Sequence, residues 1–118
     1  MKYLCQVWFE GGVLDSMSPD EKRKFDAESH AYDVGLVEQG NMIVAEALQS
    51  PSSAVTVRVR DGEISTTDGP YAETKEQLGG FILINAKDMY DAIRIAAGIP
   101  LARLGSIEVR PIYDFSVG

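Results

Sequence analysis

The chain has 118 residues, of which 45% are hydrophobic and 25% charged, as is typical of a globular protein, and its length suits one domain covering residues 1–118. Eleven basic against eighteen acidic residues give a net charge of −7, which disfavours direct binding to nucleic-acid phosphates. The single cysteine excludes an internal disulfide and fits a cytoplasmic location. Since no apolar run approaches the ~20 residues of a membrane helix, no membrane association is expected.

Strand and helix patterns alternate along the first half of the chain. Residues 2–10 alternate in polarity, which predicts a strand with Cys5 buried on its core face. Ser18-Pro19-Asp20-Glu21 predicts a helix start with a capping box, and Gly40-Asn41 is typical of a helix end. Residues 41–48 are then expected to form a second strand.

A hairpin is the clearest pattern of the second half. Residues 55–60 and 63–67 alternate in polarity around Asp61-Gly62, a dipeptide that favours a two-residue hairpin turn. The stretch 71–78 is polar and is expected to be a structured loop. The remaining elements are expected to be an apolar strand over residues 81–84, a helix over residues 89–97 and a last strand over residues 106–112.

This order predicts an α+β fold with a ferredoxin-like βαββαβ antiparallel sheet, an added hairpin and two helices on one face. The second face of the sheet is left uncovered by this arrangement. We expect that face to carry Leu4, Gln6, Trp8, Arg58, Glu108 and Arg110. Apolar groups on an uncovered sheet favour a homodimer in which two such faces cover each other. The alternative is a solvated face with ion pairs such as Glu108 with Arg58.

The stretch from Asp68-Gly69-Pro70 through Gly79-Gly80-Phe81 resembles the signature of the DGPF-type branch of the YCII-related family, with Tyr71 in place of the usual phenylalanine. Residues 107–112 resemble the final strand of that branch. The resemblance implies a ferredoxin-like fold that pairs into a dimeric α/β barrel. Relatives in the wider family have a His–Asp pair proposed to act as acid and base on a small molecule, while some DGPF-type proteins are associated with alternative sigma factors.

The resemblance places the family histidine at His30, in the first long helix. His30 is also the only histidine of the chain, and its side chain suits proton transfer near neutral pH. The family aspartate has no match in Ala45-Glu46-Ala47-Leu48, so Asp68 is the substitute on motif grounds. Helical spacing leaves Asp26 and Asp33 as alternatives. A solvated histidine flanked by carboxylates is the competing interpretation.

A small-molecule site near Trp8, His30 and residues 68–73 is the first functional hypothesis. Tyr71 and Glu73 lie in the polar loop where binding groups are common, although a turn and a solvated charge cluster explain them equally well. Arg58 and Arg110 either hold an anionic ligand or pair with Glu108 and Glu10. One histidine and one cysteine do not make a usual zinc site, and no cofactor is implied. The alternative is a non-catalytic regulatory or protein-interaction domain linked to sigma-factor systems.

Overall fold

A computed structural model describes residues 1–116. The larger helices and the strands lie within three residues of their expected bounds, except that the third sheet strand begins four residues earlier, at Gln77. The short helices α1, η1 and η2 were not expected. In chain order the elements are β1 (Lys2–Phe9), α1 (Gly12–Asp15), α2 (Pro19–Glu38), β2 (Met42–Ala47), η1 (Pro51–Ser53), β3 (Val55–Arg60), β4 (Glu63–Asp68), β5 (Gln77–Asn85), α3 (Met89–Gly98), η2 (Pro100–Arg103) and β6 (Ser106–Pro111).

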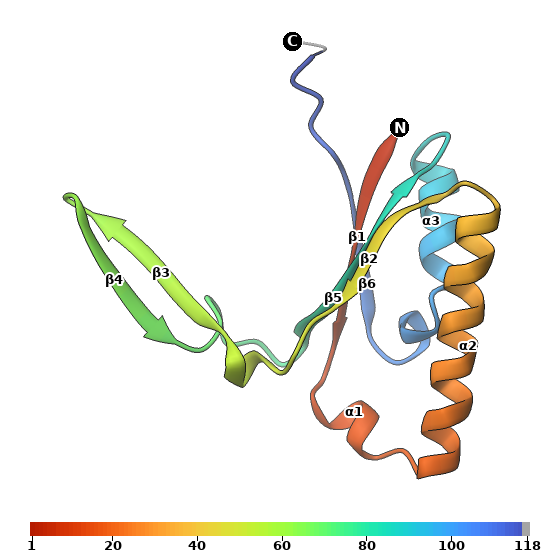
Figure 1. Cartoon of the computed structure of the whole chain (residues 1–118), viewed down its shortest axis with the longest axis horizontal. Coiled ribbons are helices and arrows are strands. Elements are labelled where there is room, and N and C mark those ends of the chain that lie inside the picture. Colours follow the sequence, from red (N-terminus) through yellow and green to blue (C-terminus); the bar gives the residue numbers. More distant parts are fainter. Residues whose placement is uncertain (117–118) are drawn as a thin grey trace.

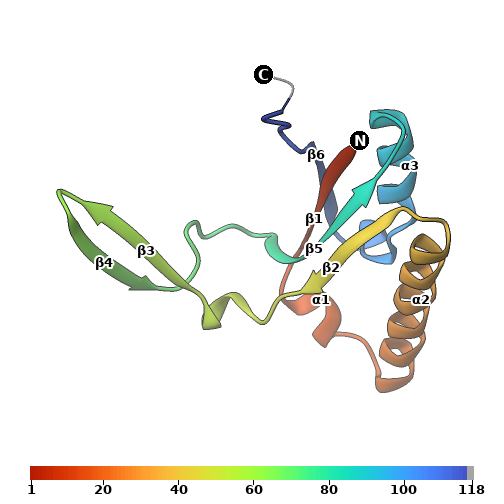
Figure 2. The same ribbon diagram turned by 45° about the horizontal axis from the view of Figure 1, so that its top comes forward.

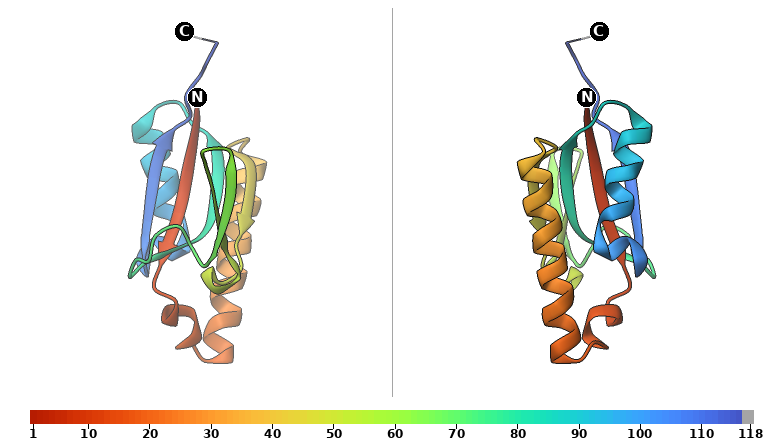
Figure 3. Two further views of the ribbon diagram at one scale, coloured as in Figure 1. Left: turned by 90° about the vertical axis from the view of Figure 1, so that its left-hand side faces the viewer. Right: turned by 90° about the vertical axis from the view of Figure 1, so that its right-hand side faces the viewer.

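Four strands form an antiparallel sheet in the order β2-β5-β1-β6. Helices α2 and α3 both cover one face of this sheet and leave the other open (Figures 1 and 3). The strand order and the one-sided helices confirm the predicted ferredoxin-like α+β fold. The pairing of two such sheets into a dimeric barrel stays a prediction.

The core lies between the sheet and the two helices. Tyr3, Cys5 and Val7 alternate along β1 as buried residues, and the register places Ile84 and Ile82 of β5 beside Tyr3 and Cys5. The helices contribute further buried side chains, namely Leu36 from α2 and Ala92, Ile95 and Ala96 from α3. The period-two pattern of β1 therefore identifies the face that the helices cover.

Helix α2 begins as the sequence predicted. The Ser18 hydroxyl accepts a hydrogen bond from the Glu21 amide at 3.1 Å, and the Ser18 amide donates to the Glu21 carboxylate at 3.0 Å. Farther along, the Tyr32 hydroxyl donates to the Ile95 carbonyl at 2.6 Å and so links α2 to α3. The Tyr32 ring needs a glycine opposite it, because a Cβ at Gly98 would lie 2.4 Å from the hydroxyl oxygen.

Strands β3 and β4 form a separate two-stranded hairpin, and within residues 1–116 they pair only with each other. We call this hairpin the arm. The arm extends away from the open face of the sheet, on the side opposite the helices (Figures 1 and 2). It is joined to the sheet by two linkers, residues 48–54 and 69–76. The proline in each linker interrupts strand pairing, because it has no amide to donate.

The position of Arg58 in the arm contradicts one expectation about the open sheet face. Arg58 does not lie on that face beside Glu108; it belongs to the arm, where it pairs with Ser65. Glu108 instead accepts hydrogen bonds from Arg110 on the same strand, at 2.9 and 3.1 Å. The predicted Glu108–Arg58 pair was therefore wrong, because periodicity assigns a residue to a strand face but does not tell which sheet the strand joins.

Candidate ligand-binding site

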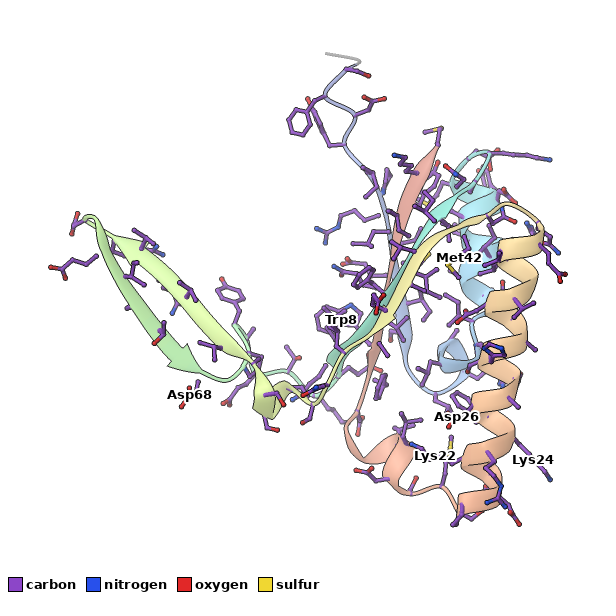
Figure 4. All side chains as sticks on the ribbon, viewed as in Figure 1. Trp8, Lys22, Lys24, Asp26, Met42 and Asp68 are labelled. Atoms are coloured by element: carbon purple, nitrogen blue, oxygen red, sulfur yellow. The ribbon has the colours of Figure 1, made fainter. Side chains whose placement is uncertain are left out.

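A hollow of about 460 Å³ lies where the linkers of the arm meet the sheet. We call it the arm-root hollow. Its sheet wall includes Trp8, which is half-buried and lies on the open face of β1, away from α2 (Figure 4). Its other wall comes from the linkers. The hollow is lined by Trp8, Leu48, Gln49, Ser50, Pro51, Ser53, Ala54, Pro70, Tyr71, Ala72, Thr74, Gln77 and Leu78.

The lining of the arm-root hollow is mainly apolar and aromatic. Its polar side chains are neutral amides and hydroxyls, and no Asp, Glu, Lys or Arg of the described residues is among its lining. Small-molecule sites usually have a volume of ~300–1,000 Å³ and an apolar lining with a few polar groups that fix orientation. In both size and chemistry, the hollow suits an uncharged ligand with a flat apolar body.

Hydrogen bonds fix the linkers that form the outer wall. The Gly69 amide donates to the Ala54 carbonyl at 2.7 Å, and the Thr56 hydroxyl donates to the Gly69 carbonyl at 3.0 Å. Tyr71 follows these hydrogen-bonded residues and is 81% exposed. The guanidinium carbon of Arg58 lies 5.8 Å from the centroid of the Tyr71 ring. Arg58 therefore contacts the candidate site indirectly, by packing over the ring of Tyr71.

His30 lies on α2, on the helix-covered side of the sheet, and is exposed. Its neighbour Asp33 is half-buried and lines a smaller hollow of about 220 Å³ with Ser29 and Glu46. Burial raises the pKa of the Asp33 carboxyl, and the nearby His30 charge opposes this rise. Asp33 is therefore close enough to His30 for its carboxyl pKa to respond to the charge of the imidazole.

One predicted grouping is wrong for a single chain. His30 and Trp8 were expected to share a pocket with residues 68–73, but His30 belongs to α2, which covers one face of the sheet, whereas Trp8 lies on the other face (Figures 1 and 4). Asp68 is the last residue of β4 in the arm, so it lies on the Trp8 side and far from α2, where Asp26 is exposed (Figure 4). Asp68 therefore cannot orient His30 within one chain.

The other predicted ligand-binding residues are scattered. Glu73 is exposed and lines a shallow depression beside the arm-root hollow rather than the hollow itself. Arg110 is paired with Glu108 on β6, and Arg58 lies in the arm. The two arginines belong to different sheets, so the structure does not bring them together as a clamp for an anion.

The family model for the YCII-related domain matches residues 1–116 of the sequence. The chain belongs to the YCII-related family. It is also similar to an uncharacterised protein of Rhizobium meliloti (strain 1021), with 32% identity over 120 residues that cover 100% of this chain and 97% of the relative. Assignment to the DGPF-type branch rests on residues 68–81 and stays a prediction. Since the relative is itself uncharacterised, the function of this YCII-related chain has to be argued from its own residues.

Other reactive groups of the YCII-related chain offer little chemistry. Cys5 is fully buried, and burial raises the pKa of its thiol to about 11, so it behaves as a small core side chain rather than a nucleophile. Among residues 1–116, no three His, Cys, Asp or Glu side chains converge into a possible metal site. None of the helices in the described part of the chain is long and apolar enough to cross a membrane.

Sequence reasoning missed most of the linker residues that line the arm-root hollow. Leu48 and Pro51 precede the arm, and Pro70 and Thr74 follow it, so the wall is built from segments that lie about twenty residues apart. The two prolines were the available signal, since each interrupts a strand pattern. They predict turns, however, and only the fold shows that these turns lie side by side near Trp8.

Proposed function

We propose that this YCII-related chain binds a small, uncharged and mainly apolar organic molecule in the arm-root hollow. The observation that carries the proposal is the lining of that hollow, which includes an aromatic side chain from the sheet and one from a linker and contains no Asp, Glu, Lys or Arg of the described residues. Trp8 and Tyr71 are each able to stack on a flat ligand. Gln49, Ser50 and Gln77 supply neutral donors and acceptors that orient it.

The proposal includes a homodimer. The open sheet face has a half-buried apolar centre formed by Leu4, Phe81 and Leu83, with the Glu108–Arg110 pair at one edge. A centre of large apolar side chains with a charged rim is typical of a surface that a partner covers. A second copy of the chain that covers this centre, and whose own centre is covered in return, buries both centres at once.

Acid–base chemistry at His30 is a second candidate function, located on the helix side of the sheet. The observation that favours it is the half-buried Asp33, whose carboxyl pKa is raised by burial and which senses the His30 charge. In this scheme His30 takes a proton from a small substrate near the hollow of about 220 Å³, and Asp33 positions the imidazole. Such proton transfer or elimination needs no cofactor.

The neutral dye Nile red tests the ligand-binding proposal. Its fluorescence rises in an apolar site, and Trp8 is the only tryptophan of the chain, so quenching of its emission reports binding nearby. We expect binding with one dye per chain. Tyr71→Ala should weaken it by about tenfold, since a stacked aromatic ring typically contributes ~1 kcal/mol or more. Tyr71 is 81% exposed, so the substitution leaves the core intact.

Tyr90→Ala is the matched control, because Tyr90 is 84% exposed and lies on α3, far from the arm-root hollow. This variant should bind the dye like the wild type. Equal affinity in wild type, Tyr71→Ala and Tyr90→Ala, or dye binding without quenching of Trp8, would show that the dye reports general surface hydrophobicity and would refute the proposed site.

A further inference from the structure

The arm has one face of aliphatic side chains that the rest of its own chain leaves in solvent. Val55, Val57 and Val59 alternate along β3 and are 56%, 59% and 57% exposed. Val59 pairs with Ile64, which is 75% exposed, so the two share this face. Val57 and Val55 pair with Thr66 and Asp68, so the apolar part of this face follows β3 and the turn end of β4. We call Val55, Val57, Val59 and Ile64 the aliphatic face of the arm.

The opposite face of the arm is polar. Thr56, Arg58 and Arg60 pair across the hairpin with Thr67, Ser65 and Glu63. An antiparallel hairpin with one mainly apolar and one polar face is typical of a sheet that is covered on one side and solvated on the other. A two-stranded hairpin is marginally stable in water by itself, so the aliphatic face needs a covering surface.

The dimensions of the chain indicate how large that surface is. The chain exposes 8338 Å², whereas a folded monomer of 12.9 kDa exposes roughly 6,300 Å². The radius of gyration is 16.4 Å, against about 13.5 Å for a compact domain of this length. The excess of ~2,000 Å² per chain falls within the range of obligate homodimers, which bury ~1,000–2,500 Å² on each subunit.

We propose that the arm is a clasp for a second copy of this chain, which lies in the angle between the arm and the open sheet face. The aliphatic face packs on the open sheet face of that copy, around Leu4, Phe81 and Leu83, and the arm of the second copy does the same in return. The reach is sufficient, since six-residue strands are ~20 Å long and the outer strands of a four-stranded sheet lie only ~14 Å apart.

A second copy fits this place better than an unrelated protein for two reasons. Both apolar surfaces occur on the same chain and lie on the same side of the sheet, so a twofold axis lets each cover the other in a closed dimer. The excess surface also matches what such a dimer buries, with no need for a further partner. The clasp goes beyond ligand binding in the arm-root hollow and does not depend on it.

The clasp is tested by sedimentation velocity on the full chain. The wild type should sediment as a dimer of twice 12.9 kDa. Val57→Asp places a charge in the middle of the aliphatic face and should raise the dimer dissociation constant by at least about 100-fold. Ser65→Asp is the matched control, because it adds the same charge to the polar face of the arm, opposite Arg58. This control should leave the dissociation constant within about threefold of the wild-type value.

Amide hydrogen exchange of the wild type adds a readout that needs no variant. Amides of residues 55–68 should be protected at high protein concentration and lose protection on dilution below the dissociation constant. A monomeric wild type at 100 μM would overturn the clasp. A dimer whose dissociation constant is unchanged by Val57→Asp and whose arm amides exchange freely would also overturn the clasp, but it would leave a dimer between the sheet faces possible. If the clasp passes both tests and the wild type does not bind Nile red, only the proposed ligand binding is refuted.

Discussion

Asp33 combines a half-buried carboxyl group with a neighbouring histidine, and this predicts an unusual pH dependence. Burial raises its pKa above the ordinary value of 3.8, so the folded chain holds the proton more tightly than the unfolded chain. The resulting stabilisation is fully present below pH 3.8 and is lost as the pH rises through the higher folded pKa. Asp33→Asn mimics the protonated group. It should therefore unfold at higher urea concentration than the wild type at pH 7, and the advantage should shrink on acidification.

A carbon-13 NMR titration of the Asp33 carboxyl measures the same effect directly. The positive charge of His30 lowers the pKa of Asp33, although less than burial raises it. His30→Gln should therefore move the Asp33 pKa farther up. If the carboxyl titrates at or below 3.8, or does not respond to His30→Gln, the second candidate function loses its positioning carboxylate.

At the scale of single elements, the N-terminal cap of α2 allows the loss of stability on its removal to be predicted. Ser18 and Glu21 exchange hydrogen bonds in a capping box, and the amide of Ser18 lowers the pKa of the Glu21 carboxyl. Removing a serine N-cap typically costs about 1 kcal/mol. Ser18→Ala should lower the melting temperature by about 4 °C. Ser53→Ala, at the exposed end of η1, is the control; an equal loss in both variants would contradict a specific role for the cap.

The elements that the sequence predicted well are those with strong local signals. The capping box identified α2, the period-two alternation identified β1, and Asp61-Gly62 identified the hairpin turn, where Asp61 does adopt a positive φ of 52°. The short helices α1 and η2 were missed, because four residues are too few to show a period. The start of β5 at Gln77 was missed because its first residues are polar.

The candidate site was harder to predict because it depends on long-range placement. Strand alternation did put Trp8 on the face opposite Tyr3 and Cys5, while the helices were expected on the Tyr3 side. Those two inferences already separate Trp8 from His30 within one chain. The first functional hypothesis grouped them nevertheless, because it took His30 from the motif resemblance, and a motif carries no information on which face of the sheet its residues occupy.

At the scale of the whole molecule, the clasp makes thermal stability depend on protein concentration. The arm is anchored at its root by the hydrogen bonds from the Gly69 amide to the Ala54 carbonyl and from the Thr56 hydroxyl to the Gly69 carbonyl, but its aliphatic face is covered only when a second copy binds. For a dimer that unfolds to two chains, mass action shifts the equilibrium toward the folded state as concentration rises. With an unfolding enthalpy of ~165 kcal/mol per dimer, the melting temperature should rise by about 3 °C for each tenfold increase in concentration.

Calorimetry between 5 and 500 μM measures this slope, and the arm variants explain its origin. Val57→Asp should melt at a lower temperature that is independent of concentration, since the monomer no longer gains from association. Ser65→Asp should keep the wild-type slope, because its charge lies on the polar face. A flat wild-type slope would mean that the fold is stable without a partner and that the excess of ~2,000 Å² in the total surface of 8338 Å² stays exposed in the free chain. A slope retained in Val57→Asp would place the dimer contact on the open sheet faces alone, leaving the arm free to close over the hollow beside Trp8.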